Sequence, residues 1–155
     1  LESRFPDRPA LFGGPIGQGT ARFINALADR QLIPWVIPPL MLDNIGALEA
    51  GDGAYLRALI EKATGKPLEE LYAAREASLK AFARALDPLR ATLRSQPYLC
   101  GPAPAYADYI VFSVLQWARI ASKAPVLPPE DAVAQWFERL LDAHGGLGRK
   151  EPARA

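Results

Sequence analysis

The chain has 155 residues, of which half are hydrophobic and 23% are charged, and its formal net charge is +1. This length and composition are typical of one folded domain and exclude a disordered chain. The near-neutral charge gives no basic surface for nucleic acid. One Cys and one His cannot form a Cys/His zinc site or an internal disulfide, so we expect no metal.

Two features bear on where the protein resides. The longest apolar run, residues 32–42, contains three prolines and is too short to span a bilayer. The first residues lack the charged and then apolar pattern of a signal peptide. With a single Cys, these features lead us to expect a cytoplasmic protein without a membrane partner.

Prolines and glycines divide the chain into segments that favour helices. The 15 Pro and 12 Gly cluster in short stretches, and the segments between them are rich in Ala, Leu, Arg and Glu. Residues 32–37 include β-formers, but their proline argues against a central strand. We therefore predict an all-α fold, a helical bundle around one buried central helix.

The first third of the chain predicts a linker and two bent helical pieces. Residues 1–5 resemble the last turn of a helix, and residues 10–19 resemble a linker. A helix is predicted over residues 16–33, where Pro34 stops or kinks it. A second piece is predicted over residues 40–49.

The middle of the chain predicts a short helix and a long one. Residues 54–64 form the short helix, which Gly65 ends. Residues 67–94 form the long one, with an apolar stripe at three- and four-residue spacing and a bend at Pro88.

The last third predicts the central helix and a final amphipathic helix. Residues 106–122 are apolar on nearly every side, which is typical of a helix at the centre of a bundle. Residues 129–144 form the last helix, ended by Gly145 and Gly146. Its predicted core residues are Val133, Trp136, Phe137, Leu140 and Leu141.

Arg22, Asn25 and Asp29 form a polar stripe at i, i+3 and i+7 of the first full helix. This stripe is either a solvated face or the rim of a site for a small polar ligand. Trp35 lies beside the apolar 32–42 run and is either core, pocket wall or interface patch. The spacing alone does not choose between these alternatives.

Asp108 is the most distinctive polar position. It is the third residue of the central helix if Ala105 is the cap, where an acid accepts a backbone N–H and meets the positive end of the helix dipole. We interpret it as a structural helix cap rather than a ligand-binding carboxylate. Cys100 is interpreted as a small turn residue, His144 as a helix-end cation and the glycines of residues 13–19 as linker.

Two stretches resemble the glutathione S-transferase family. Residues 1–12, LESRFPDRPALF, resemble the end of the family's thioredoxin-like half and its linker. Residues 96–110, QPYLCGPAPAYADYI, resemble its turn and capping motif, in which an aromatic-Leu-x-Gly turn precedes Ser/Thr-x-Ala-Asp and an apolar helix. Asp108 matches the family's capping acid. The family's Ser/Thr cap falls on Ala105, which has no hydroxyl group.

The resemblance implies a domain organisation. Residues 1–14 would be the end of a thioredoxin-like domain with its linker, residues 15–147 a helical C-terminal domain, and residues 148–155 a tail. Glutathione, the co-substrate, would be bound and activated mainly by the thioredoxin-like half, which is expected before residue 1. No catalytic residue is therefore assigned here, and the 155-residue chain alone is expected to be inactive.

The resemblance also implies a function. The chain would form the wall that binds a hydrophobic electrophile in a bacterial-type, homodimeric glutathione transferase, with members that resemble lignin β-etherases nearest in character. Arg22, Asn25, Asp29 and Trp35 are the candidate substrate-binding residues. Two alternatives are a non-catalytic glutathione-transferase-like interaction domain and a stand-alone helical bundle that binds a small ligand.

Overall fold

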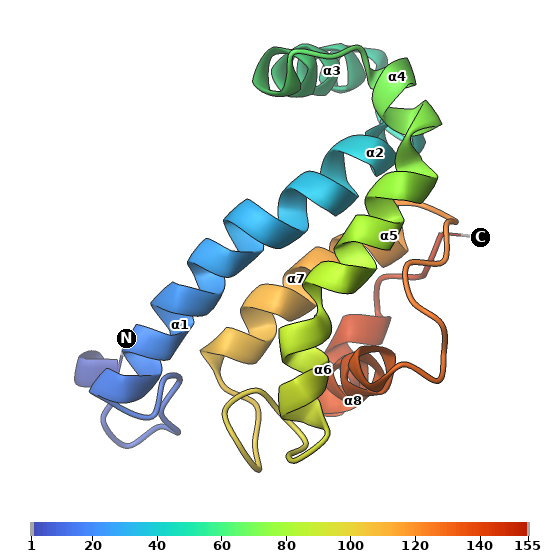
Figure 1. Cartoon of the computed structure of the whole chain (residues 1–155). Coiled ribbons are helices and arrows are strands. Elements are labelled where there is room, and N and C mark those ends of the chain that lie inside the picture. Colours follow the sequence, from blue (N-terminus) through green and yellow to red (C-terminus); the bar gives the residue numbers. More distant parts are fainter. Residues whose placement is uncertain (1, 155) are drawn as a thin grey trace.

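The computed structural model describes residues 2–154 and is helical through most of this range (Figure 1). Its described part contains no β-strand, only an isolated bridge between Tyr98 and Gly101, so the predicted all-α class is confirmed. No helix in residues 2–154 is long and apolar enough to cross a membrane. Leu1 and Ala155, which we assigned to the last turn of a helix and to a tail, lie outside the described residues. The α-helices are α1 (Pro15–Leu27), α2 (Ile33–Ile45), α3 (Ala50–Thr64), α4 (Leu68–Ala73), α5 (Arg75–Ala85), α6 (Asp87–Leu93), α7 (Tyr106–Ala121) and α8 (Ala132–Gly146).

One helical run extends from α1 to α2 through a π-helical turn, η2 (Ala28–Leu32) (Figure 1). Of the two predicted effects of Pro34, the stop is not seen: the helix continues, with an irregular π turn directly before the proline. A proline crowds the carbonyl of the residue four positions earlier, and the wider π turn directly before Pro34 relieves that contact. The N–H of Ile33 donates to the carbonyl of Ala28, five residues back.

α2 tolerates two further prolines because its packing offsets their cost. Pro38 and Pro39 lie inside the helix, and each removes one backbone donor. Val36 and Leu40 are fully buried in the core, and Met41 is nearly so. The buried apolar surface of this segment stabilises the helical conformation against the weak helix propensity of its prolines.

The long helix predicted over residues 67–94 is in fact three helices, α4, α5 and α6. No Pro or Gly lies near Ala74, so the sequence gives no signal for the break there. The Arg75 guanidinium donates to the Tyr72 carbonyl at 3.2 Å and lies 4.2 Å from the Tyr72 ring centroid, so a side chain occupies an acceptor that an unbroken helix would use. The break at Leu86 places Pro88 in the first turn of α6, where a proline costs no hydrogen bond.

α7 is the central helix of the bundle, as predicted. It contacts α1, α2 and α8, and in the view of Figure 1 it lies beside the α1–α2 run and passes behind α5. Its buried residues follow helical spacing and include Val111, Leu115 and Ala118. This burial is the reason that the segment is apolar on nearly every side.

α8 covers one side of α7, and its whole predicted apolar stripe is buried. The helix begins after Asp131 rather than at Pro129, because the Asp131 carboxylate accepts the Val133 N–H at 2.8 Å and so caps the helix. The same carboxylate pairs with Arg90 of α6, with 2.7 Å between Arg90 Nη2 and Asp131 Oδ2. Arg90 therefore fixes the start of α8 against α6.

Asp108 is fully buried at the start of α7 and accepts three hydrogen bonds. Its Oδ2 accepts the Ala105 N–H at 3.0 Å, while Oδ1 accepts the Leu99 N–H at 2.8 Å and the Trp136 indole N–H at 2.9 Å. One carboxylate thus joins the 99–105 turn, α7 and α8. The contacts with Leu99 and Trp136 were not predicted.

We expect Asp108→Ala to lower the free energy of unfolding by about 3 kcal/mol, because it leaves three N–H groups without an acceptor. Chemical denaturation monitored by circular dichroism measures this loss. Asp7→Ala is the matched control, because it removes an exposed carboxylate from a turn near the N-terminus, outside any helix. It should change stability by about 0.5 kcal/mol or less. Equal effects of the two substitutions would contradict the role given to Asp108.

Candidate functional site

A hollow of about 570 Å³ lies between α1 and the start of α7. We call it the α1 hollow. Its side chains come from three segments: the loop before α1, the α1–η2 run and the first residue of α7. They are Phe12, Gln18, Ala21, Arg22, Asn25, Ala26, Asp29, Arg30 and Tyr106.

The polar stripe predicted from spacing forms one wall of the α1 hollow. Arg22, Asn25 and Asp29 all line it, and the Asn25 side-chain amide donates to Asp29 Oδ2 at 2.8 Å. A smaller hollow of about 250 Å³ adjoins it and shares Asn25, Asp29 and Tyr106. Asn25, Asp29 and Tyr106 therefore lie on the boundary between two neighbouring hollows.

Two arginines give the α1 hollow a positive component. In residues 2–154, no carboxylate lies within ion-pair distance of Arg22 or Arg30, since the ion pairs involve other residues. Asp29 is the only acid in the lining. The hollow can therefore accept a group that carries hydrogen-bond acceptors.

Aromatic rings form the opposite wall of the α1 hollow. The rings of Phe12 and Tyr106 meet edge to face with centroids 5.1 Å apart. The Tyr106 N–H donates to the Leu11 carbonyl at 2.9 Å, which ties the loop before α1 to the start of α7. Sequence reasoning missed this wall because it depends on contacts between residues almost a hundred positions apart. Gln18 and Arg30 were also missed, although they continue the helical spacing of Arg22.

Gly17 allows the Phe12 segment to lie against α1. A Cβ atom on Gly17 would overlap the carbonyl oxygen of Phe12, whereas one on Gly19 would meet no atom within 4 Å. Our prediction that residues 13–19 form a linker is correct only up to Gly14, because α1 begins at Pro15. The glycines of this segment thus have two uses: Gly13 and Gly14 have positive φ, of 69° and 94°, and Gly17 allows a close backbone approach.

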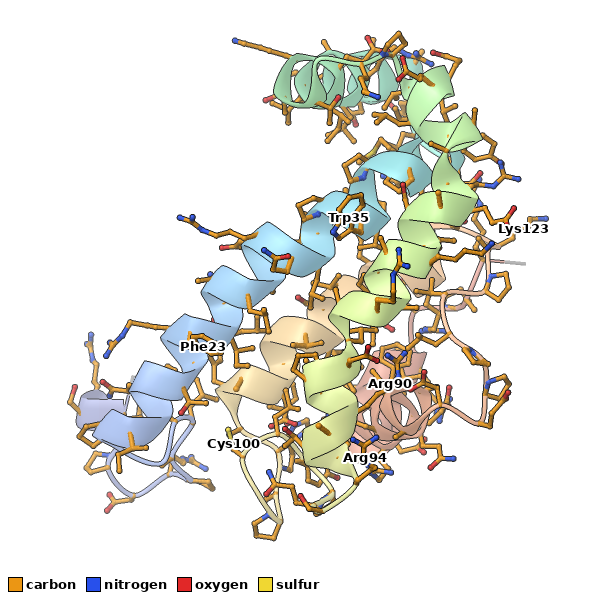
Figure 2. The ribbon with its side chains drawn as sticks, in the orientation of Figure 1. Phe23, Trp35, Arg90, Arg94, Cys100 and Lys123 are labelled. Atoms are coloured by element: carbon orange, nitrogen blue, oxygen red, sulfur yellow. The ribbon has the colours of Figure 1, made fainter. Side chains whose placement is uncertain are left out.

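Trp35 does not line the α1 hollow or the adjoining hollow. Its side chain is 41% exposed on α2, on the same helical run as Phe23, which is 68% exposed (Figure 2). The structure thus brings Arg22, Asn25 and Asp29 together and places Trp35 apart from them. Of the alternatives for Trp35, this placement fits an interface patch.

The remaining candidate nucleophile and base do not form a reactive pair. Cys100 is exposed in the turn before α7, where partial burial of the thiol and the negative charge of Asp108 raise its pKa. A raised pKa lowers the thiolate fraction, so Cys100 is a poor nucleophile. His144 Nε2 lies 2.8 Å from the Tyr109 hydroxyl, and its φ of 53° places it in a left-handed turn that ends α8.

A metal-dependent site has no support in the part of the chain that the structure describes. Within residues 2–154, no group of three or more His, Cys, Asp or Glu side chains is arranged to hold a metal ion. The α1 hollow offers amide, guanidinium, carboxylate and aromatic groups instead. These groups can bind and orient an organic molecule but do not themselves supply an activated nucleophile.

Comparison with known families bears on this arrangement. Residues 20–143 match the family model described as glutathione S-transferase, C-terminal domain. The match spans more than half of the chain and includes α2 to α7 entirely, most of α1 and α8, and all of the polar stripe. It agrees with the resemblance found in the turn and capping motif.

Gly17→Ala and Gly19→Ala should affect stability in opposite directions. Gly17→Ala forces the Phe12 carbonyl away from α1 and should destabilise the chain by about 1–3 kcal/mol. Gly19→Ala fills open space in the same helix and should stabilise it by about 0.5–1 kcal/mol. Thermal unfolding of the two variants measures both effects. A stabilising Gly17→Ala would show that the loop before α1 does not rest on this helix.

Proposed function

The chain belongs to the family of glutathione S-transferase C-terminal domains, and from that premise we propose that it forms the electrophile-binding wall of a glutathione transferase. The enzyme would join glutathione to, or cleave with it, an organic electrophile that has a hydrophobic body. The observation that carries this proposal is the α1 hollow, in which a polar helix face stands opposite an aromatic pair.

The chemistry that the proposal requires is divided between two parts of an enzyme. The glutathione thiol must lose its proton, because the thiolate is the nucleophile. We assign that step to a thioredoxin-like half of the full-length protein, as the family resemblance implies, and to no residue of this chain. The part played by this chain is to hold the electrophile in reach of the thiolate and to exclude water around it.

We assign specific roles to the residues around the α1 hollow. Phe12 and Tyr106 would contact the apolar body of the electrophile, and Arg22 would bind acceptor groups on it. The hydrogen bond from Asn25 to Asp29 supports a fixed polar edge, since the amide is held by its neighbour one turn away. The proposed domain boundaries are residues 1–14, 15–147 and 148–155, with the hollow at the first of these junctions.

We also propose that the enzyme is a homodimer that uses the exposed apolar side of the α1–α2 run. Ile16 is 86% exposed, and Phe23 and Trp35 are also exposed on this run. Large exposed apolar side chains on one helix are typical of protein interfaces. This assignment gives Trp35 an interface role in place of the substrate-binding role that the family resemblance implied.

The first test measures glutathione conjugation by the full-length protein against a panel of aryl halides, benzylic halides and aryl ethers. Asn25→Ala should raise the KM for the electrophile by about three- to tenfold. The substitution removes the hydrogen bond to Asp29 that fixes the polar edge of the α1 hollow, and such a bond contributes about 0.5–1.5 kcal/mol. The KM for glutathione should not change, since glutathione is assigned to the other half.

Lys62→Ala, on the exposed surface of α3, is the control and should leave both KM values unchanged. A protein that neither binds glutathione nor reacts with any member of the panel would contradict the enzyme proposal. If that protein also binds a stable partner protein through the exposed apolar side of the α1–α2 run, the two results together would instead favour a non-catalytic interaction domain.

Phe23→Glu tests the dimer. A carboxylate at the centre of an apolar interface must be desolvated without a partner, so the variant should be monomeric at concentrations where the unmodified protein is a dimer. Light scattering coupled to size-exclusion chromatography measures the mass. Arg84→Glu, on the exposed side of α5, should leave the mass unchanged. A Phe23→Glu variant that stays dimeric would place the interface elsewhere.

A further inference from the structure

A third hollow, of about 420 Å³, lies at the C-terminal end of α7. We call it the far hollow, because the α1 hollow lies at the other end of the same helix. Its walls come from α7, the 122–131 loop, α8 and residues 153–154. The apolar part of the lining includes Leu115, Val126, Leu127 and Phe137.

The charged groups of the far hollow are mainly positive. Arg119, Lys123 and Arg154 line it, and in the described residues none of the three forms an ion pair with a carboxylate. The single acid in the lining, Glu138, is paired with Arg149 at 2.8 Å. Within residues 2–154, the hollow therefore presents apolar surface beside three cations that form no ion pair, and the other acid at its edge, Asp43, accepts a hydrogen bond from the Ser122 hydroxyl of the lining.

Two of these cations also hold the walls together. Arg119 Nη2 donates to the Gly148 carbonyl at 3.0 Å, and Arg154 Nη1 donates to the Ala121 carbonyl at 3.0 Å. The Arg154 backbone N–H donates to the Arg119 carbonyl at 3.1 Å. Bonds to neutral carbonyls leave the charge of both guanidinium groups in place. Lys123 is exposed on the loop and lies on the opposite side of the bundle from Phe23 in Figure 2, and its side chain makes no such bond to any of residues 2–154.

We propose that the far hollow binds a small organic anion with an apolar body, such as a medium-chain or aromatic carboxylate. Its volume lies within the range of ligand pockets, about 300–1,000 Å³, and its lining has their usual composition of apolar walls with a few charged groups. The apolar body would lie against Val126, Leu127 and Phe137. The carboxylate would face Lys123 at the entrance, with the two arginines adding to the positive potential.

This site is independent of the proposed transferase activity. It shares no lining residue with the α1 hollow, and it is formed entirely by the chain described here. It can therefore be present whether or not the full-length protein conjugates glutathione.

The test is a titration of the 155-residue chain with octanoate, followed by two-dimensional amide NMR. We expect saturable shifts at Leu115, Val126, Leu127 and Phe137. Octylammonium, which has the same chain and the opposite charge, should produce none of them. Lys123→Glu should weaken octanoate binding by roughly fivefold or more, because it replaces an attractive charge with a repulsive one. Leu127→Trp should remove binding by filling the hollow.

Lys62→Glu makes the same charge change on α3, away from the far hollow, and should leave octanoate binding unchanged. Lys123 is exposed, so Lys123→Glu tests the site even if Leu127→Trp disturbs the fold, which circular dichroism reports. The proposal is overturned if octanoate does not saturate, if its shifts lie at the α1 hollow, if octylammonium binds equally, or if Lys123→Glu and Lys62→Glu act alike.

Discussion

The carboxylate of Asp108 is the contact on which the rest of the bundle depends. It is buried without a cation, and three N–H groups from the 99–105 turn and α8 stabilise it. Because α7 is the central helix, fixing its first turn also fixes where Tyr106 lies, and so where the aromatic wall of the α1 hollow lies. A structural contact at one end of α7 thereby sets the geometry of a candidate site.

Local sequence patterns predicted the helices in which the pattern of apolar residues follows directly from burial. The apolar stripe of α8 and the all-round apolar character of α7 follow from burial, and both are seen in the structure. The breaks in residues 67–94 and the continuation through Pro34 could not be predicted in the same way. At Ala74 an arginine side chain competes for a backbone carbonyl, and before Pro34 a π turn relieves the contact between the proline ring and the preceding carbonyl. Both depend on contacts that spacing does not encode.

The residues of the candidate site also differ in whether the sequence could predict them. Arg22, Asn25 and Asp29 could be grouped from the sequence, because residues three and four apart share one face of a helix. Phe12 and Tyr106 could not be found, since they meet only after the chain before α1 folds back onto α7. Trp35 was assigned to the substrate wall with the polar stripe because the family resemblance implied it, yet it lies further along the helical run and is exposed.

The π turn between α1 and α2 has a consequence for how such a chain tolerates insertions and deletions. A π turn holds one more residue than an α-helical turn but advances the chain by about the same angle, so removing one residue from Ala28–Leu32 would restore regular α-helix and leave α2 in nearly the same rotation about its axis. Val36 and Leu40 would stay in the core, whereas Pro34 would lose the wider turn that relieves its contact with the preceding carbonyl. Removing a residue from the regular part of α1 would instead rotate everything that follows by about 100°. The run can therefore lose a residue at the π turn with less damage to the core than a loss within α1 would cause.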